Sequence, residues 1–268
     1  MPIAQSARIH PTAIIDPTAD IGEGVEIGPF VVVEKDVKVG TGSIIRTGAH
    51  LVGPTIIGCN NTVFSHAVLG EQPQHLRYNG EPARLVIGDN NIIREHVTIH
   101  RGMSVAGETR VGNNNFLMAN CHIAHDCRVG NNCILANGAL LAGHCVLENN
   151  VYISGNSAIH QFVRVGRLAL LSGVSSSTMD IPPFILQNRV NAVVGLNVVG
   201  MRRAGIPGLH IDAVRKAFHI LYREGHVLPE ALALIERNLG QYPEVAEMVA
   251  FIRAPGRGIT LNSGLEAA

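Results

Sequence analysis

The sequence predicts a mainly β fold built as a solenoid, followed by a small C-terminal α-helical domain. An aliphatic residue recurs at every sixth position from Ile3 to Leu171, and 27 of the 29 positions in that phase are Ile, Val or Leu. Small residues, such as Ala19, Ser43 and Cys121, stand two positions before many of these aliphatics. A six-residue period fits neither an amphipathic helix nor an alternating strand, and it is typical of hexapeptide solenoids with stacked coils.

Each hexapeptide is expected to form one short strand and one turn, with its aliphatic and its small residue facing inward. Three hexapeptides would close one triangular coil, and the repeat is long enough for roughly nine coils. Glycine directly follows many of the aliphatics, as at Gly22, Gly40 and Gly112. We attribute these glycines to sharp corners, because glycine readily adopts the positive φ angle that such a corner requires.

Two polar insertions interrupt the repeat, at residues 70–86 and 101–110. Because the aliphatic phase never slips across them, their lengths must preserve it. The repeat continues to about Ser175 and is followed by the pair Pro182–Pro183, which ends it.

We assign residues 1–190 to the solenoid and residues 191–268 to the helical domain. Asp212–Glu224 places apolar residues on one helical face, and Pro229 and Pro243 each suit the first turn of a further helix. The final fifteen residues are expected to form a loose tail.

Composition excludes several classes of function. The formal net charge is zero and the pI is about 7.2, which argues against a general nucleic-acid binder or a protein of anionic membranes. No stretch is long and apolar enough to span a bilayer, and no charged-then-apolar leader precedes the repeat. We therefore expect a cytoplasmic protein without a transmembrane segment.

Most of the cysteines fall in the small inward phase of the repeat. These four are Cys121, Cys127, Cys133 and Cys145, and we interpret them as core residues rather than metal ligands or disulfide partners. Cys59 lies in another phase and has no evident partner. Free thiols fit a reducing compartment.

The repeat also predicts which residues are neighbours, because residues 18 apart should stack about 4.8 Å from each other. On this rule His125 lies beneath Gly143, which lies beneath Gln161. Asp126 lies beneath His144, and His160 joins the same corner. Histidines, an aspartate and a glutamine thus converge within about two coils. Gly143 leaves His125 uncovered, so that a substrate could approach the imidazole.

Such a cluster suits general-base catalysis. A neutral His125 imidazole could take the proton of an attacking hydroxyl, and the Asp126 carboxylate could fix its tautomer. The Gly143 N–H is a plausible oxyanion donor. Since no serine or cysteine is placed as a nucleophile beside His125, direct attack without a covalent enzyme intermediate is favoured.

Two other interpretations of the histidines stay open. A zinc site is one alternative, because some hexapeptide solenoids bind zinc through histidines of adjacent chains. Isolated histidines at solenoid corners or on the helices are interpreted as ordinary surface residues; these are His50, His66, His96, His210, His219 and His226.

Several motifs identify a family. The geometry resembles the left-handed parallel β-helix of the hexapeptide acyltransferases, an exception to the right-handed crossover rule. Its motifs are IAHDC at Ile123–Cys127 with His122 before it, LAGH at Leu141–His144, HQF at His160–Phe162, VTIHRG at Val97–Gly102, PQHLRYNGEP at Pro73–Pro82, and VGLN at Val194–Asn197 with MRRAG after it. Together they resemble the UDP-N-acetylglucosamine O-acyltransferases that begin lipid A biosynthesis, over essentially the whole chain.

The resemblance implies a role for each site residue. His125 would be the general base that activates the 3-hydroxyl of UDP-N-acetylglucosamine, Asp126 would orient it, and the Gly143 N–H would stabilise the oxyanion. Sugar, phosphate and acyl groups would be held by His122, His144, His160 and Gln161. The acceptor would be contacted by the first insertion through Gln74, His75 and Arg77, and the nucleotide or the carrier by Asn197 and Arg203.

The resemblance also implies the partners. The donor would be a 3-hydroxyacyl chain on acyl carrier protein, and the protein would be a homotrimer with active sites between neighbouring solenoids. No cofactor and no metal are implied. Because the carrier protein is acidic, basic residues of the C-terminal part are candidate docking charges; these are Arg202, Arg203, Arg215, Lys216 and Arg223.

Acyl-chain length in this family is set by where a side chain blocks a groove between chains. The corresponding residues here are Leu170 and Gly173, and a glycine leaves the groove open for a chain of about fourteen carbons by family analogy.

The sequence departs from the family pattern at His75, at Arg77 and at Gln187–Arg189. N-acylation of the 3-amino analogue therefore stays open, as do a hexapeptide sugar acetyltransferase that uses acetyl-CoA and a non-catalytic scaffold.

Overall fold

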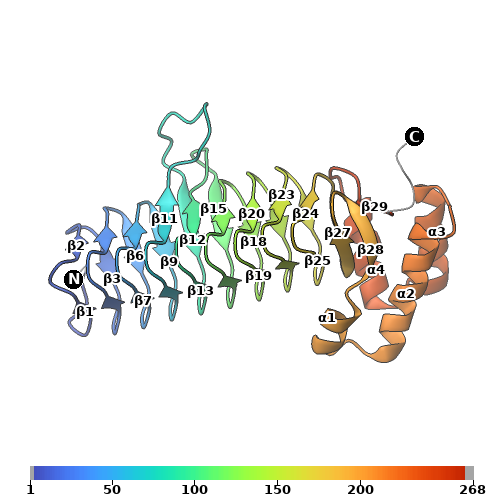
Figure 1. The fold of residues 1–268 in the computed structure, drawn as a ribbon, viewed down its shortest axis with the longest axis horizontal. Coiled ribbons are helices and arrows are strands. Elements are labelled where there is room, and N and C mark those ends of the chain that lie inside the picture. The colour runs from blue at the N-terminus through green and yellow to red at the C-terminus, as the bar shows by residue number, and fades with distance from the viewer. Residues whose placement is uncertain (1–2, 263–268) are drawn as a thin grey trace.

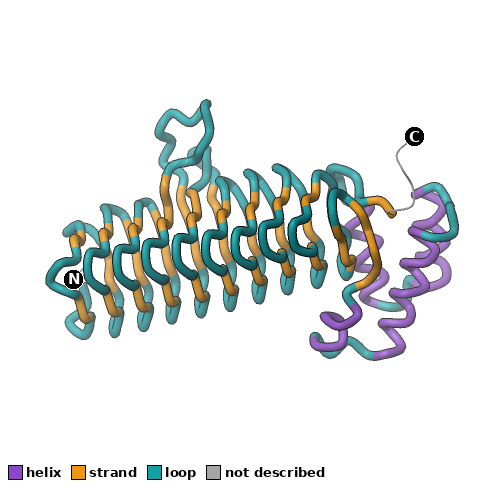
Figure 2. Tube along the Cα trace, in the orientation of Figure 1, coloured by secondary structure: helices purple, strands orange, loops and turns teal. Residues whose placement is uncertain are grey.

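The six-residue repeat folds into short parallel strands, most of them two residues long, that wind around a triangular coil. The structure is a computed structural model that describes residues 3–262. The coils stack into a long prism, and the helices gather at its C-terminal end (Figure 1). In Figure 2 the strands form continuous rows along the prism, while turns make its corners.

Three sheets form the faces of the prism. The first sheet has twelve strands: β1 (Arg8–Ile9), β4 (Glu26–Ile27), β7 (Ile44–Ile45), β10 (Thr62–Val63), β13 (Ile92–Ile93), β16 (Phe116–Leu117), β19 (Ile134–Leu135), β22 (Tyr152–Ile153), β25 (Leu170–Leu171), β27 (Ile185–Asn188), β28 (Ala192–Leu196) and β29 (Leu261–Asn262). The second has nine: β2 (Ile14–Ile15), β5 (Val32–Val33), β8 (His50–Leu51), β11 (Val68–Glu71), β14 (Thr98–His100), β17 (His122–Ile123), β20 (Leu140–Leu141), β23 (Ala158–Ile159) and β26 (Ser176–Ser177). The third has eight: β3 (Asp20–Ile21), β6 (Val37–Val39), β9 (Thr55–Ile57), β12 (Arg84–Ile87), β15 (Glu108–Val111), β18 (Arg128–Val129), β21 (Val146–Leu147) and β24 (Arg164–Val165).

The register confirms that residues 18 apart stack, as in the pairs of β17 with β20, where His122 is opposite Leu140. Across the first insertion the offset is 30, since Val68 pairs with Thr98. Across the second it is 24, since Thr98 pairs with His122. Both offsets are multiples of six, so the aliphatic phase is preserved. The loop between β11 and β12 projects from the prism (Figure 1).

The core lies along the axis of the prism. Most aliphatics of the repeat are buried, and Leu51, Ile93 and Ile153 have 0% exposure, whereas Ile3 and Ile9 at the N-terminal end and Val105 in the second insertion are exposed. The small residues two positions earlier are buried with them, for example Ala67 and Cys145. All five cysteines lie within the described range, where none forms a disulfide, and the four in the inward phase are buried as predicted.

The explanation predicted for the repeat glycines is wrong. Gly40 does not have a positive φ; in most hexapeptides the positive φ falls two residues later, for example at Asn114 (φ 57°) and Asn150 (φ 60°). A β-carbon at Gly40 would lie 2.5 Å from the carbonyl carbon of Gly58 in the next coil. These glycines therefore permit close stacking of the coils, and asparagine, which tolerates the left-handed region, makes many of the corners.

The C-terminal part contains four helices: α1 (Val198–Arg203), α2 (Gly208–Tyr222), α3 (Leu228–Leu239) and α4 (Pro243–Arg253). The three predicted helices are present, with Pro229 and Pro243 in the first turns of α3 and α4. Helix α2 begins earlier than Asp212, and the short α1 was not predicted. The three long helices pack against one another through buried side chains, such as Val214 of α2, Ile235 of α3 and Met248 of α4. In the described part of the chain, no helix combines the length and apolar character needed to cross a membrane.

The end of the chain is more ordered than predicted. The boundary drawn at 190/191 falls in the turn between β27 and β28, which pair with each other, so the first sheet continues to Leu196. The expected loose tail includes β29, which pairs with β28. The Thr260 N–H donates to the carbonyl of the buried Asp180 at 2.9 Å, which anchors this segment to the solenoid. Residues 263–268 of the expected tail lie outside the described residues.

Candidate active site

A cleft of about 660 Å³ opens over strands β17, β20, β23 and β26 of the second sheet. It is lined by seven of the fourteen residues predicted for the site: Gln74, His75, His122, His125, Gly143, His160 and Gln161. A hollow of the same volume lies over β1, β4 and β7, near the N-terminal end. In its lining Arg8 pairs with Glu26, Arg46 lies over the Phe64 ring, and Nδ1 of His10 lies 2.9 Å from Oγ1 of Thr12. The histidine–carboxylate pair that suits catalysis is therefore that of the first cleft.

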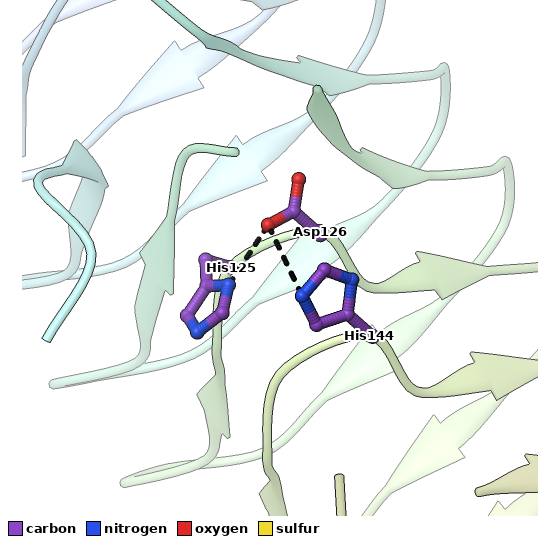
Figure 3. Close-up of side chains that lie close together, drawn as sticks. All are labelled: His125, Asp126 and His144. Atoms are coloured by element: carbon purple, nitrogen blue, oxygen red, sulfur yellow. Dashed lines mark hydrogen bonds and ion pairs between the residues drawn. The ribbon is translucent and has the colours of Figure 1, made fainter. Parts of the chain in front are cut away.

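The centre of the cleft is a histidine held by a carboxylate. Nδ1 of His125 lies 2.8 Å from Oδ2 of Asp126, and Nε2 of His144 lies 3.7 Å from the same oxygen. Figure 3 shows the two imidazoles on either side of the carboxylate, both turned toward that oxygen. Asp126 (φ 59°) and His144 (φ 62°) are the positive-φ corner residues of consecutive coils, and this is why they stack.

The second insertion fixes the carboxylate of Asp126. The Met103 N–H lies 3.3 and 3.2 Å from the two carboxylate oxygens, and the Asp126 N–H donates to Oγ1 of Thr109 at 2.8 Å. Burial favours the neutral carboxyl, but the hydrogen bonds from His125 and Met103 outweigh it and lower the pKa of Asp126. The carboxylate is therefore ionised at neutral pH and can accept the Nδ1–H of His125.

Gly143 lies against the other side of the imidazole, as the stacking rule predicts. A β-carbon at Gly143 would lie 2.7 Å from both Nε2 and Cε1 of His125. His125 is 8% exposed and lines the cleft, with the ring of His75 edge-on at 5.4 Å. The Gly143 N–H donates to no acceptor among the described residues. A base and a free amide thus stand side by side in one cleft.

A second layer of histidines supports the floor of the cleft. Nδ1 of His122 lies 2.7 Å from Oγ1 of Thr98, and the His100 ring packs edge-on against His122 at 4.8 Å. Burial, reinforced by the charge of His122, lowers the pKa of His100 to about 4. Burial also lowers the pKa of His122 and of His144. These imidazoles are therefore neutral at pH 7. The His144 ring also stacks on Phe162 at 4.5 Å.

Several predicted residues lie outside this cleft of the single chain. Arg77 is exposed in the projecting loop, and Arg203 is exposed at the end of α1. The Asn197 side chain caps α1 by accepting from the Gly200 N–H at 2.9 Å, and it donates to the Leu168 carbonyl at 2.8 Å. Leu170 and Gly173 belong to the β25 segment of the first sheet and do not line the cleft.

Sequence reasoning missed part of the site. Ser176, Ser177 and Thr178 line the cleft one coil beyond Ala158–His160, and the stacking rule could have placed them there. Met103 and Thr109 hold Asp126 from the second insertion, whose path no repeat specifies.

The same cluster could hold a metal ion, because donor atoms of His125, Asp126 and His144 all lie within 4.8 Å of one another. Two ligands of a tetrahedral zinc ion, each about 2.0 Å from it, lie about 3.3 Å apart. The 2.8 Å between His125 Nδ1 and Asp126 Oδ2 is shorter and fits a hydrogen bond instead. Because the carboxylate accepts the Nδ1–H, Nε2 is the nitrogen of His125 that carries a free lone pair. The absence of a metal stays a prediction.

Comparison with known proteins places the chain among acyltransferases. A family model described as UDP N-acetylglucosamine O-acyltransferase, domain 2, matches residues 180–260. A model described as bacterial transferase hexapeptide (six repeats) matches residues 18–53 and 108–143. Two relatives are named acyl-[acyl-carrier-protein]–UDP-N-acetylglucosamine O-acyltransferase. The protein of Halorhodospira halophila is 45% identical over 94% of this chain and 98% of its own length. The protein of an Anaeromyxobacter species is 46% identical over 94% of this chain and 99% of its own length.

Solved structures agree with the sequence relatives. The UDP-N-acetylglucosamine acyltransferase of Campylobacter jejuni superposes with a TM-score of 0.89 at 40% identity, covering 95% of this chain and 99% of that one. The corresponding enzyme of Bacteroides fragilis gives a TM-score of 0.86 at 40% identity, covering 96% and 99%. The predicted left-handed parallel β-helix with a C-terminal helical part is thereby confirmed.

Proposed function

Because this chain belongs to the UDP-N-acetylglucosamine O-acyltransferase family, we propose that it acylates the 3-hydroxyl of UDP-N-acetylglucosamine. The donor is a 3-hydroxyacyl chain carried as a thioester on acyl carrier protein, and the reaction is the first step of lipid A biosynthesis. The observation that carries the mechanism is the arrangement of Asp126, His125 and Gly143, in which an oriented base adjoins an unpaired backbone amide.

The transfer proceeds by direct attack. Nε2 of His125 takes the proton of the acceptor hydroxyl as its oxygen attacks the thioester carbonyl, and the ionised Asp126 stabilises the imidazolium that forms. The Gly143 N–H donates to the oxyanion of the tetrahedral intermediate. When the intermediate collapses, the C–S bond breaks and the carrier thiolate takes the proton back from His125.

A covalent acyl-enzyme is disfavoured by the positions of the nearest thiols. Cys127 and Cys145 have 0% exposure, and their thiols donate to backbone carbonyls inside the prism. The hydroxyls of Ser176 and Ser177 lie beyond Ala158–His160 in the cleft rather than beside His125. The acceptor hydroxyl is thus the nucleophile that the geometry supports.

Substrate groups are assigned to residues that line the cleft and to Arg77 and His144, which do not line it but are close in sequence to residues that do. Gln74 and His75 of the projecting loop contact the acceptor together with Arg77, while His122, His144, His160 and Gln161 hold sugar, phosphate and acyl groups. In the single chain Arg203 and the acyl-chain residues Leu170 and Gly173 lie away from this cleft. We therefore assign them, with Asn197, to the complete site of a homotrimer, in which a neighbouring solenoid forms the missing wall. Leu140, 45% exposed in the cleft of one chain, would be covered by that neighbour.

The carrier protein is assigned to the exposed basic side chains near the helices. Arg202 and Arg203 end α1, and Arg215 and Lys216 lie on α2. All are exposed, as is Arg223 directly after α2. An acidic carrier would be steered to this end of the prism by charge complementarity.

The test is product analysis with purified protein. We expect mass spectrometry to detect acylated UDP-N-acetylglucosamine from 3-hydroxyacyl carrier proteins but not from acetyl-CoA, and no preference for the 3-amino analogue. His125→Ala should lose about 10²–10⁴-fold in kcat, the usual contribution of a general base. A folded His125→Ala protein with full activity would refute the mechanism. Loss of activity after treatment with a chelator, restored by zinc, would instead support the metal alternative.

A further inference from the structure

Two buried thiols lie directly behind the wall of the candidate site. The Cys127 thiol donates to the carbonyl of Ala142 at 3.1 Å, and the Cys145 thiol donates to the carbonyl of His160 at 3.1 Å. The neighbouring Cys145 thiol, together with burial, raises the pKa of Cys127 well above its usual value. Cys127 is therefore a protonated thiol with a hydrogen to donate.

Each of these carbonyls shares a peptide group with an amide of the cleft. The Ala142 carbonyl belongs to the same planar unit as the Gly143 N–H, and the carbonyl and N–H of a trans peptide point in opposite directions. A thiol that holds the carbonyl toward the core consequently turns the Gly143 N–H away from the core. Cys145 does the same for the peptide group that carries the Gln161 N–H.

Equivalent peptide groups in other coils show both halves of this arrangement. The Gly112 carbonyl accepts from Nδ2 of the buried Asn91 at 3.0 Å, while the N–H of Asn113, in the same peptide group, donates to Oδ1 of Asn131 at 2.7 Å. Two further peptide groups follow the pattern. In Gly58–Cys59 the carbonyl accepts from Ser43 and the N–H donates to Asp89. In Gly88–Asp89 the carbonyl accepts from Asn61 and the N–H donates to Asn113.

The peptide group of Ala142 and Gly143 has the inner hydrogen-bond donor but, among the described residues, lacks the outer acceptor. The residue stacked on Gly143 is Gln161, and its side chain accepts no hydrogen bond from the Gly143 N–H. This amide is therefore fixed from inside by Cys127 and left free outside. A ligand oxygen can take the place that an asparagine occupies in the other coils.

We propose that Cys127 is a positioning residue for acyl transfer, whose buried thiol fixes the peptide group that presents the Gly143 N–H to the developing oxyanion. The inference rests on the proposed function. Cys127 touches no substrate; it acts only through the backbone, and the loss of its hydrogen bond would let the peptide group tilt. Catalysis would be impaired in the transition state, where the oxyanion exists, more than in substrate binding.

The solenoid itself contains precedents for the variants needed. Ser157, at the same inward phase, donates to the Ser172 carbonyl at 2.8 Å, so a serine can replace the thiol as a donor. Val25 and Val151 are buried at that phase, so valine fits without a donor. Cys133 offers the matched control, because its thiol also donates to a carbonyl, that of Glu148 at 3.1 Å, but Glu148 does not line the cleft.

The experiment compares Cys127→Val, Cys127→Ser and Cys133→Val under the transferase assay, with thermal unfolding measured for each. We expect Cys127→Val to lower kcat about tenfold, less than the 10²–10³-fold of a deleted oxyanion donor. The KM values of both substrates should stay within about twofold, and Cys127→Ser should restore kcat. Cys133→Val should lose stability comparably while keeping kcat.

Equal kcat values for Cys127→Val and Cys133→Val would overturn the inference, as would a Cys127→Ser protein as slow as the valine variant. If Cys127→Val does not fold, Cys127→Ala takes its place, since Ala139 and Ala169 are buried at the same phase. No transfer by the unmodified protein would refute the proposed function instead, and this outcome is distinguishable because it precedes any comparison of variants.

Discussion

The imidazole of His125 occupies the space that a side chain at Gly143 would need. A β-carbon there would stand 2.7 Å from Nε2, closer than van der Waals contact allows. Because Gly143 does not have a positive φ, its backbone would accept an L-residue without strain. The requirement for glycine therefore comes from the neighbouring ring alone, and this separates a catalytic effect from a folding effect.

Gly143→Ala should leave the fold intact and displace the His125 ring. Because a misplacement of about 1 Å can cost about 10²-fold in rate, we expect kcat to fall by about that factor. Gly208→Ala, at the start of α2, is the matched control, since a β-carbon there meets nothing within 4 Å. Steady-state kinetics of both variants provide the check, and equal kcat values would show that the ring has room to move.

Asp126→Asn should retain the shape of the site but lose its charge. An amide can neither fix the His125 tautomer as a carboxylate does nor stabilise the imidazolium, so we expect kcat to fall about 10²-fold or more with little change in KM. Asp16→Asn is the control, because Asp16 caps a turn in the N-terminal coils through Thr18. A kcat near that of the unmodified protein would remove Asp126 from the mechanism.

The buried His100 should make the protein sensitive to acid. Its pKa is about 4 in the fold against the usual 6.5. Between these values the unfolded chain binds more protons, so the free energy of unfolding decreases as pH falls from about 6.5 to about 4. The loss attributable to His100 between pH 7 and pH 5 is about 2 kcal/mol per chain.

His100→Leu should abolish this part of the pH dependence, leaving the contributions of His122 and His144, which have the same sign. Urea unfolding of both proteins at the two pH values measures the difference. An unchanged pH dependence in His100→Leu would mean that His100 is protonated alike in the folded and unfolded states.

Gly173→Met should shift donor preference toward shorter acyl chains. A β-carbon at Gly173 would meet only the Gly155 carbonyl oxygen, at 3.6 Å, so a side chain fits and would extend into the proposed groove. One buried methylene contributes about 0.8 kcal/mol, so sharp selection of chain length requires steric exclusion. Competition between two 3-hydroxyacyl carrier proteins, followed by mass spectrometry, gives the product ratio; an unchanged ratio contradicts the ruler role.

Lys216→Glu should weaken the interaction with the acidic carrier. We expect the KM for acyl carrier protein to rise several-fold, with the KM for UDP-N-acetylglucosamine unchanged and a smaller dependence on salt. Lys35→Glu makes the same charge change in the turn that precedes β6, a strand far from the helices (Figure 1). If both variants raise the KM for the carrier equally, the effect is one of net charge rather than of docking.

The solenoid was predicted well from the sequence, because a strict six-residue period specifies which residues stack on each other in adjacent coils. The stacking of His125 and Gly143 followed from an offset of 18 and is confirmed. The reason for the repeat glycines was mistaken, since close approach between coils leaves the same residue in the sequence as a positive φ does. Only the backbone geometry distinguishes the two causes.

Residues outside the repeat were predicted less well. Met103 holds Asp126 from an insertion, where no periodicity places the chain. The assignment of Asn197 to the nucleotide or the carrier stays a prediction. That its side chain caps α1 was not predicted, because a six-residue helix is too short to leave a periodic pattern. Strand β29 depends on pairing with β28, about 70 residues earlier, and such a long-range contact has no local signal.

Across the two insertions, with offsets of 30 and 24, the chain returns in register with the preceding coil, so the later coils keep their stacking. The projecting loop between β11 and β12, which carries Gln74 and His75, can thus vary while His125 and Gly143 keep their alignment. Specificity and catalytic geometry can diverge separately in such a protein.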